Sequence, residues 1–308
     1  MANKFYVPGE QRAARVGDLF AVIATRYDLI NDFQSLGLHR WWKRRLTRLA
    51  DVQRGELALD LCCGTGDVTF SLARKGALVV GLDFSGPMLA VAESRKESIA
   101  RRTSRSTSRR NGAGTPLNEP AGASAGFRRP GPPDRGTRKT DSAHEPPLAR
   151  PPASAALRRE RSDEALQDPS TAVMFLHGNA MAIPFADESF EIVTMSYGLR
   201  NLAGMGEGLR EMCRVAKPGG RVLVLDFGKP PNRLWRAIYF AYLKACVPWF
   251  GKMFCGDSDT YAYILESLRR YPAQEGVAAA MRDTGFVNVR IVNLLGGVMS
   301  INCGQKKA

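Results

Sequence analysis

Leu57-Ala58-Leu59-Asp60-Leu61-Cys62-Cys63-Gly64-Thr65-Gly66-Asp67 joins a short apolar run, an acid and two glycines one residue apart. This pattern predicts a buried parallel strand that ends in a glycine turn, where an open α/β sheet presents backbone N–H groups to a ligand. A dinucleotide would favour a third glycine where Thr69 stands and no carboxylate at the helix entrance, where Asp67 lies. S-adenosylmethionine fits better, because it has one carboxylate, no phosphate and a sulfonium cation.

A second apolar run, Leu78–Asp83, ends in an acid 17 residues after Gly66. A carboxylate at that strand end can accept hydrogen bonds from both hydroxyls of a ribose. The two runs together predict a methyl-donor site; the alternative is an ordinary strand, turn and helix with no ligand.

Composition and charge limit the functional classes to which the chain can belong. The chain has 308 residues and a formal net charge of +14, which by itself would suggest nucleic acid or an anionic surface. Six scattered cysteines without metal-ligand spacing predict reduced thiols in the cytoplasm and no metal site. The first ten residues lack an apolar leader core and no window is as apolar as a membrane span, so we expect any membrane contact to be peripheral.

A change of composition divides the chain. Residues 99–171 are rich in Arg, Ser, Pro and Gly, which predicts a disordered insertion that buries little apolar area. Its basic character is compatible with RNA or anionic lipid, and a solvated linker is the simpler interpretation. On either side, residues 1–98 and 172–308 are predicted to form the two halves of one domain.

Alternating apolar runs and helical patterns outside the insertion predict an α/β fold with a doubly wound, seven-stranded sheet, closed by an antiparallel terminal hairpin. The predicted strands are Leu57–Cys62, Ala77–Asp83, Val173–His177, Glu191–Ser196, Arg221–Phe227, Val287–Val292 and Val298–Cys303. The predicted helices between them are Asp67–Lys75, Gly86–Ser98, Met205–Val215 and Pro272–Thr284. Ala216–Gly220 is predicted to stop a helix and turn into the fifth strand. Arg15–Leu49, broken near Ser35-Leu36-Gly37, and Pro231–Arg270 are predicted to be helical.

Several sequence blocks outside the insertion resemble those of one protein family. They are Tyr27-Asp28-Leu29-Ile30-Asn31-Asp32 with Ser35, Gly37, His39 and Trp42, then Leu59–Asp67, Gly178–Phe185, Ser196-Tyr197-Gly198-Leu199-Arg200-Asn201 and Lys217–Arg221. The chain resembles the UbiE-type ubiquinone/menaquinone biosynthesis C-methyltransferases, whose fold is the Rossmann-like class I methyltransferase fold. The insertion is foreign to that pattern, and we expect the helix after Asp83 to end or bend near it.

The resemblance implies methyl transfer from S-adenosylmethionine to a ring carbon of a polyprenylated hydroquinone in respiratory quinone synthesis. The donor contacts that it implies are Asp60, Gly64, Thr65, Gly66, Asp83, Asn179, Ala180 and Ser196. Asp60 is expected to orient the amino group of the donor, Asp83 to hold its ribose, and Asn179 and Ala180 to lie beside its adenine. The sequence supports this placement, because these residues follow or end predicted parallel strands.

A ring carbon becomes nucleophilic only when a neighbouring hydroxyl loses its proton, so the enzyme has to lower a phenol pKa of about 10. Arg200 is the first candidate to stabilise the phenolate; a surface ion pair is its alternative. His39 and Tyr27 are candidates for the base or for hydrogen-bond partners, and packing against Trp42 is the alternative for His39. Asp226 is expected either at the methyl-transfer end of the pocket or as the cap of a loop.

Aromatic residues cluster in residues 231–270, which we expect to form a helical acceptor lid. The clustering suggests contact with an isoprenoid tail or a membrane surface, with ordinary core packing as the alternative. A nucleic-acid methyltransferase is disfavoured, because Ser196–Arg200 replaces the motifs of that class and no Pro-Cys pair exists. A non-catalytic quinone-binding subunit and a homodimer stay open.

Overall fold

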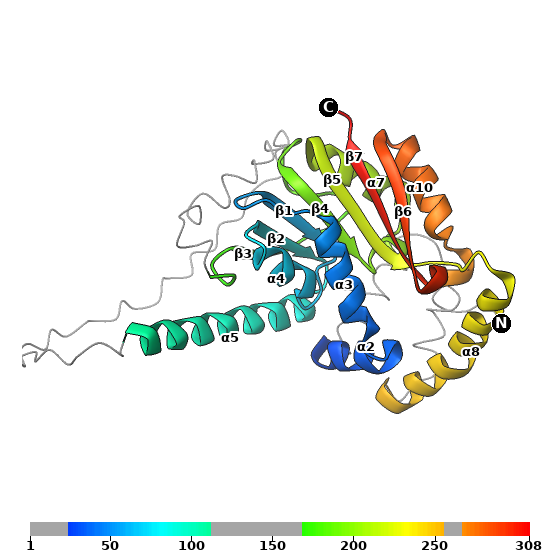
Figure 1. The fold of residues 1–308 in the computed structure, drawn as a ribbon, viewed down its shortest axis with the longest axis horizontal. Helices are drawn as coiled ribbons and strands as arrows, with labels where there is room; N and C mark the ends of the chain where they lie inside the picture. Colours follow the sequence, from blue (N-terminus) through cyan, green and yellow to red (C-terminus); the bar gives the residue numbers. More distant parts are fainter. Residues whose placement is uncertain (1–23, 112–167, 256–266) are drawn as a thin grey trace, which may run out of the picture.

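The computed structural model describes residues 24–111, 168–255 and 267–308. Its centre is one sheet of seven strands in the order β3-β2-β1-β4-β5-β7-β6. Figure 1 shows this sheet with helices packed around it and the helices α2 and α8 beyond one of its ends. The predicted α/β fold with a doubly wound sheet is therefore confirmed.

The strands match the predicted runs within a few residues. Their bounds are β1 Leu57–Leu61, β2 Leu78–Asp83, β3 Val173–His177, β4 Phe190–Ser196, β5 Ala216–Phe227, β6 Phe286–Leu294 and β7 Met299–Lys306. The first five pair in parallel, and β7 pairs antiparallel with both β5 and β6. All five residues of β1 are buried, which requires cover on both faces of the sheet.

The order of the strands creates a crevice. The chain runs from β1 through α4 (Asp67–Ala73) to β2 and through α5 (Gly86–Asn111) to β3, and then returns to place β4 on the other side of β1. The connections after β1 and β4 therefore leave in opposite directions, and ligands bind at such a switch point, beyond the carboxyl ends of the strands.

The remaining helices pack around this sheet. They are α2 Tyr27–Ser35, α3 Leu38–Leu49, α7 Met205–Val215, α8 Arg233–Cys255 and α10 Ala273–Asp283. α2 ends where Leu36 and Gly37 adopt positive φ, at the predicted break. Parts of the predicted helical regions, residues 15–23 and 256–266, lie outside the described residues.

Two predictions about local structure are wrong. α5 does not stop or bend near Ser98 but continues to Asn111 and projects away from the sheet (Figure 1). The first glycine or proline after Pro87 is Gly112, so nothing in the backbone ends the helix earlier. An ion pair between Arg101 and Glu97 and the hydroxyl of Thr103, which donates to the carbonyl of Ile99, add local support.

The second error concerns Ala216–Gly220, which does follow the end of α7 but belongs to β5. Phe190 pairs with Ala216, whereas Ile192 pairs with Arg221, so the intervening residues form a bulge. Gly219 has a φ of 74°, which a glycine adopts without strain. The predicted turn is therefore absorbed into the strand. The rest of the predicted insertion, residues 112–167, lies outside the described residues.

Candidate functional site

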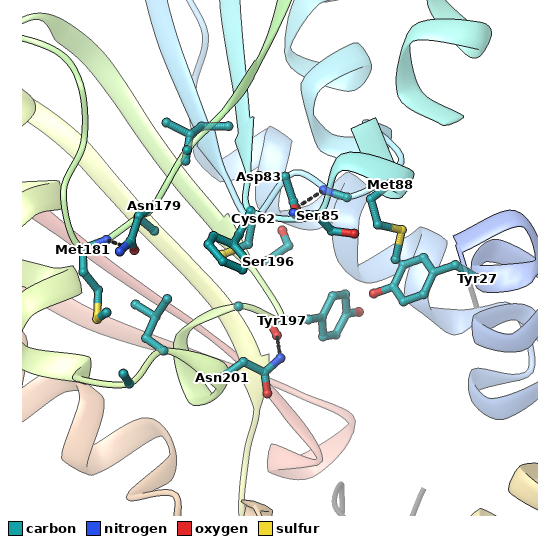
Figure 2. A pocket seen from close by; sticks show the side chains of 18 residues that line it. Tyr27, Cys62, Asp83, Ser85, Met88, Asn179, Met181, Ser196, Tyr197 and Asn201 are labelled. Atoms are coloured by element: carbon teal, nitrogen blue, oxygen red, sulfur yellow. Dashed lines mark hydrogen bonds between the residues drawn. The ribbon is translucent and has the colours of Figure 1, made fainter. Parts of the chain in front are cut away.

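The glycine turn after β1 connects the first two strands. The backbone N–H of Gly64 donates to a carboxylate oxygen of Asp83 at 2.7 Å, and the other oxygen accepts the N–H of Ser85 at 2.8 Å. Burial raises the pKa of Asp83, and each of its oxygens retains a lone pair. The carboxylate lines the large cavity of Figure 2, where it is able to accept ribose hydroxyls. That contact stays a prediction.

The two predicted glycines differ in what their missing side chains allow. Gly64 has a φ of 55° and open space where a Cβ would be, so a ligand can approach its backbone. At Gly66, a Cβ would lie 2.9 Å from the rings of Phe70 and Phe175. Gly64 therefore belongs to the cavity wall, whereas Gly66 allows α4 and β3 to pack closely behind it.

The large cavity lies at the carboxyl ends of β1 to β4 and has a volume of about 910 Å³, including its part open to solvent. Six of the predicted site residues line it: Tyr27, Gly64, Asp83, Asn179, Ala180 and Ser196. The structure thus brings together residues from α2, the glycine turn and the ends of three further strands.

Four polar side-chain atoms of this cavity are buried without a hydrogen-bond partner in the described part of the chain. They are Ser85 Oγ, Ser196 Oγ, the Tyr197 hydroxyl and Asn201 Oδ1. Unpaired buried polar atoms are rare, because each has lost its water without a replacement. Their concentration in one cavity indicates a polar ligand, and S-adenosylmethionine, with ribose hydroxyls and adenine nitrogens, fits this set.

A smaller hollow adjoins the large cavity and shares Tyr27, Cys62, Gly64, Ser196 and Tyr197 with it. Its further walls include two of the predicted residues, Asp60 and Thr65, together with Lys43 and Asp67. The two hollows therefore adjoin, one beside Asp83 and Asn179 and the other beside Asp60, and the donor contacts expected of these residues stay predictions.

Asp60 is buried in β1. Its two oxygens accept hydrogen bonds from Thr69 Oγ1 at 2.7 Å and Thr194 Oγ1 at 2.8 Å. Burial raises the pKa of this carboxyl to about 6, because the ionised form has lost most of its water. A cationic amino group beside it would stabilise the ionised form, in agreement with the role expected for Asp60.

Charged side chains join the helices to the glycine turn. The Arg95 guanidinium on α5 donates to Asp28 on α2 at 3.0 Å, to Asp67 at 2.6 Å, and to the carbonyl and hydroxyl oxygens of Thr65 at 3.0 Å. Lys43 on α3 donates to the other oxygen of Asp67 at 2.8 Å. Burial opposes ionisation of Asp67, but Lys43 and Arg95 outweigh it and hold its pKa well below the usual range. These contacts hold α2 and α3 against the donor site.

Arg200, the first candidate to stabilise the phenolate, lies in the interior of the protein. Its side chain is buried, pairs with Asp226 at 2.9 Å, donates to the carbonyl of Tyr197 at 2.8 Å, and stacks over Phe227. It belongs to the wall of neither hollow. The guanidinium thus forms a buried ion pair that supports the Tyr197 backbone, so the alternative of a surface ion pair is wrong, and the role expected of Arg200 at the phenolate stays a prediction. Asp226 also accepts the N–H of Phe227, so it caps the loop after β5.

His39 and Tyr27, the two candidates for the base, lie in different environments. His39 is buried at the junction of α2 and α3, where its Nδ1 lies 2.9 Å from Ser35 Oγ, and it lines neither hollow. Burial and the nearby Lys43 lower its pKa, so the ring is neutral near pH 7. This position favours the structural alternative for His39, whose chemical role stays a prediction, whereas Tyr27 lines both hollows.

Tyr197 is a candidate functional residue that the sequence analysis did not single out. It follows β4 with a φ of 60°, and Figure 2 shows its hydroxyl and that of Tyr27 turned toward one another. Burial raises the pKa of Tyr197 well above its ordinary value, so the phenol stays protonated. The sequence signal for Tyr197 was the block Ser196–Asn201, of which only Ser196 and Arg200 were predicted to be functional. Across the described residues, no group of three His, Cys, Asp or Glu side chains is arranged to hold a metal ion.

Comparison with known proteins agrees with this geometry. The chain is 32% identical to the ubiquinone/menaquinone biosynthesis C-methyltransferase UbiE of Azotobacter vinelandii, over 97% of this chain and 93% of that protein. It is 31% identical to the mitochondrial 2-methoxy-6-polyprenyl-1,4-benzoquinol methylase of Danio rerio, over 97% of this chain and 82% of that protein.

Solved structures confirm the fold at lower identity. A methyltransferase of Thermotoga maritima that depends on S-adenosylmethionine superposes with a TM-score of 0.52 and 14% identity, over 94% of this chain and 99% of the other. The family model of the ubiE/COQ5 methyltransferases matches residues 8–117 and 154–306, leaving out only the middle of the predicted insertion and the ends of the chain. The chain belongs to the ubiE/COQ5 methyltransferase family.

Proposed function

We propose that this protein transfers the methyl group of S-adenosylmethionine to a ring carbon of a polyprenylated hydroquinone, in the synthesis of menaquinone or ubiquinone. The observation that carries the proposal is the cluster of unpaired buried polar atoms in a cavity at the switch point of the sheet. The names of the relatives support the acceptor class.

The donor compartments divide the work of binding. Asp83 and the backbone of Gly64 would hold the ribose, Asn179 and Ala180 the adenine, and Asp60 the amino group. Bound there, S-adenosylmethionine supplies an electrophilic methyl group on a sulfonium. The residues of the chain hold the acceptor carbon in line with that methyl group, at a separation of about 3 Å.

Tyr197 would act on the acceptor. A neutral phenol in a buried site is a hydrogen-bond donor, and it stabilises a negative oxygen more strongly than it stabilises the neutral hydroxyl that precedes it. As the acceptor hydroxyl loses its proton to solvent at the open side of the cavity, charge moves to the ring carbon, which forms its bond to the methyl carbon while the carbon–sulfur bond breaks and leaves its electron pair on sulfur. The ring proton is then lost to solvent, which reaches the open side of the cavity. Tyr27, on α2, is placed to hydrogen-bond the same acceptor.

The reaction also suggests where the enzyme works. A hydroquinone with an isoprenoid tail is held in a bilayer, so we place the protein in the cytoplasm against the inner face of the membrane. The free thiols of Cys62, Cys63, Cys213 and Cys303 support a reducing compartment. No helix in the described part of the chain has the length and apolar character needed to cross a bilayer.

Methyl transfer to a short-chain demethylated hydroquinone, followed by mass spectrometry, tests the proposal. Tyr197→Phe should lower kcat by about 10- to 100-fold with little change in the affinity for S-adenosylmethionine. Tyr239→Phe is the matched control, because the Tyr239 hydroxyl is also buried and unpartnered but lies on α8 outside both hollows. If neither the wild type nor Tyr239→Phe transfers the methyl group, the proposal is overturned. If Tyr197→Phe is as active as Tyr239→Phe, the role of Tyr197 is overturned. Quinones from a deletion strain would identify the acceptor.

A further inference from the structure

The outer side of α8 is apolar although it faces solvent. Leu234 is 72% exposed and Ile238 50% exposed, one turn apart, and Tyr242 follows after another turn at 39%. Opposite them, Tyr239 and Leu243 are buried against the body of the protein. A helix that is apolar toward both the protein and the solvent needs a second partner for its outer face.

α2 presents a matching stripe. Leu29, Phe33 and Leu36 recur at helical spacing and are 50%, 48% and 83% exposed. On the same helix, Tyr27 lines the donor and acceptor cavity. The outer stripe of α2 therefore lies immediately outside the site.

The two stripes belong to one end of the molecule. The hydroxyl of Tyr242 donates to the carbonyl of Gln34 at 2.9 Å, which joins α8 to the last turn of α2. Figure 1 shows both helices at the same end of the protein, beyond the sheet. We call these six exposed apolar residues of α2 and α8 the docking face: Leu29, Phe33, Leu36, Leu234, Ile238 and Tyr242.

Basic side chains border the docking face in the described part of the chain. Arg26, Arg44, Arg233 and Lys244 are exposed on or beside the helices that form it. Arg233 and Lys244 are eleven residues apart, about three turns, so they share one border of the apolar stripe of α8.

The acids of α2 add little opposing charge. Asp28 is paired with Arg95 at 3.0 Å and Asp32 with Arg40, so their charges are compensated within the protein. α3, between them and the sheet, carries five Lys or Arg residues and no Asp or Glu. The docking face is therefore apolar in its middle and cationic at its border.

We propose that the docking face lies on a bilayer that contains anionic lipid, with its apolar side chains among the acyl chains and its basic side chains at the headgroups. Apolar residues bordered by Lys and Arg are the pattern of helices that bind in the interface plane. A second copy in a two-fold arrangement would instead bring equal basic borders together, which is unfavourable.

The inference rests on the proposed function in one respect only. If the acceptor is a hydroquinone with an isoprenoid tail, the docking face places the open cavity beside the membrane that holds it. The acceptor head then reaches Tyr27 and Tyr197 while its tail stays in the lipid.

Sedimentation of the full chain with vesicles tests the docking face directly. Wild type should bind vesicles of phosphatidylcholine with about one-third phosphatidylglycerol at least tenfold more tightly than pure phosphatidylcholine, and should lose this preference near 1 M salt. The double variants L234S/I238S and R233S/K244S should each weaken binding to the anionic vesicles about tenfold. V287S and R282S are matched controls, because Val287 is exposed on β6 and pairs with Gln305 at the other end of the sheet, and Arg282 is exposed on α10.

Several outcomes would overturn the proposal. They are binding without preference for anionic vesicles, binding of L234S/I238S equal to that of V287S, or a wild-type dimer that L234S/I238S converts to a monomer, which would make a second copy the occupant. The control variants V287S and R282S should methylate a short-chain acceptor in solution like the wild type. If the wild type lacks that activity, the proposed function fails, whereas the vesicle result still decides the docking face.

Discussion

The two walls of the cavity are held in place by different forces. The donor wall consists of strand ends and the glycine turn, and parallel pairing of β1 with β2 and β4 sets its geometry. The opposite wall, with Tyr27 on α2, is tied to it by charged side chains, chiefly Arg95 and Lys43. A wall built on backbone hydrogen bonds is positioned by the whole sheet, whereas a wall held by a few ion pairs can be loosened without unfolding the domain.

The largest effect is expected on the donor wall. Asp83→Ala should weaken the binding of S-adenosylmethionine at least tenfold, because it removes the acceptor of two backbone N–H groups together with any ribose contact, each charge-assisted bond being worth about 1.5–3 kcal/mol. Calorimetric titration measures the affinity, and Asp83→Asn, which keeps one acceptor oxygen, should show a smaller loss. An unchanged affinity in the alanine variant would exclude this strand end from the donor site.

Removing the contacts of Arg95, which join the two walls, should have a smaller effect on the binding of the donor. Arg95→Met removes the guanidinium that lies over Phe70 and contacts Asp28, Thr65 and Asp67, so we expect the KM for the donor to rise about five- to tenfold. Steady-state kinetics on a short-chain acceptor would separate this rise from a change in kcat.

Two further variants sharpen the interpretation of Arg95. Arg101→Met removes an exposed ion pair on the same helix and should leave the KM unchanged. Asp28→Asn breaks the same bridge from the other side, so combining it with Arg95→Met should cost less than the sum of the two single effects. Additive effects would show that Arg95 does not act through α2.

The smallest effect is a pH dependence of stability within the donor wall. The pKa of Asp60 is about 6 in the folded protein, above its ordinary value of 3.8, so the folded state binds the proton more tightly. The contribution of Asp60 to stability is therefore greatest below about pH 4 and falls by roughly 2–3 kcal/mol as pH rises through 6. The difference in Tm between wild type and Asp60→Asn, measured from pH 4 to 7, should follow that slope. Asp67→Asn should show the opposite dependence at lower pH, because the depressed pKa of Asp67 stabilises the folded state fully above its ordinary pKa of 3.8, and this stabilisation is lost as pH falls below that value.

Prediction from sequence succeeded best where the chain carries a local pattern. β3 and α7 match the predicted bounds, and Gly64, Asp83 and Ser196 lie at the predicted strand ends of one cavity. The prediction failed at Ser98, because an Arg- and Ser-rich segment with no glycine or proline can continue a helix. Composition alone does not show where such a helix ends. At Ala216–Gly220 it missed that a bulge lets a turn sequence remain inside a strand.

The sequence by itself determined the order of the strands along the chain, the glycine turn and the acids at the strand ends, because each depends on residues close together in the chain. Only the tertiary structure decided which polar groups meet across the cavity. Arg200 and Tyr197 are three residues apart, yet Arg200 turns inward to Asp226 on β5 and Tyr197 faces Tyr27 on α2. A charged side chain is buried only beside a partner of opposite charge, and that partner, 26 residues away, is brought to it by the pairing of β4 with β5.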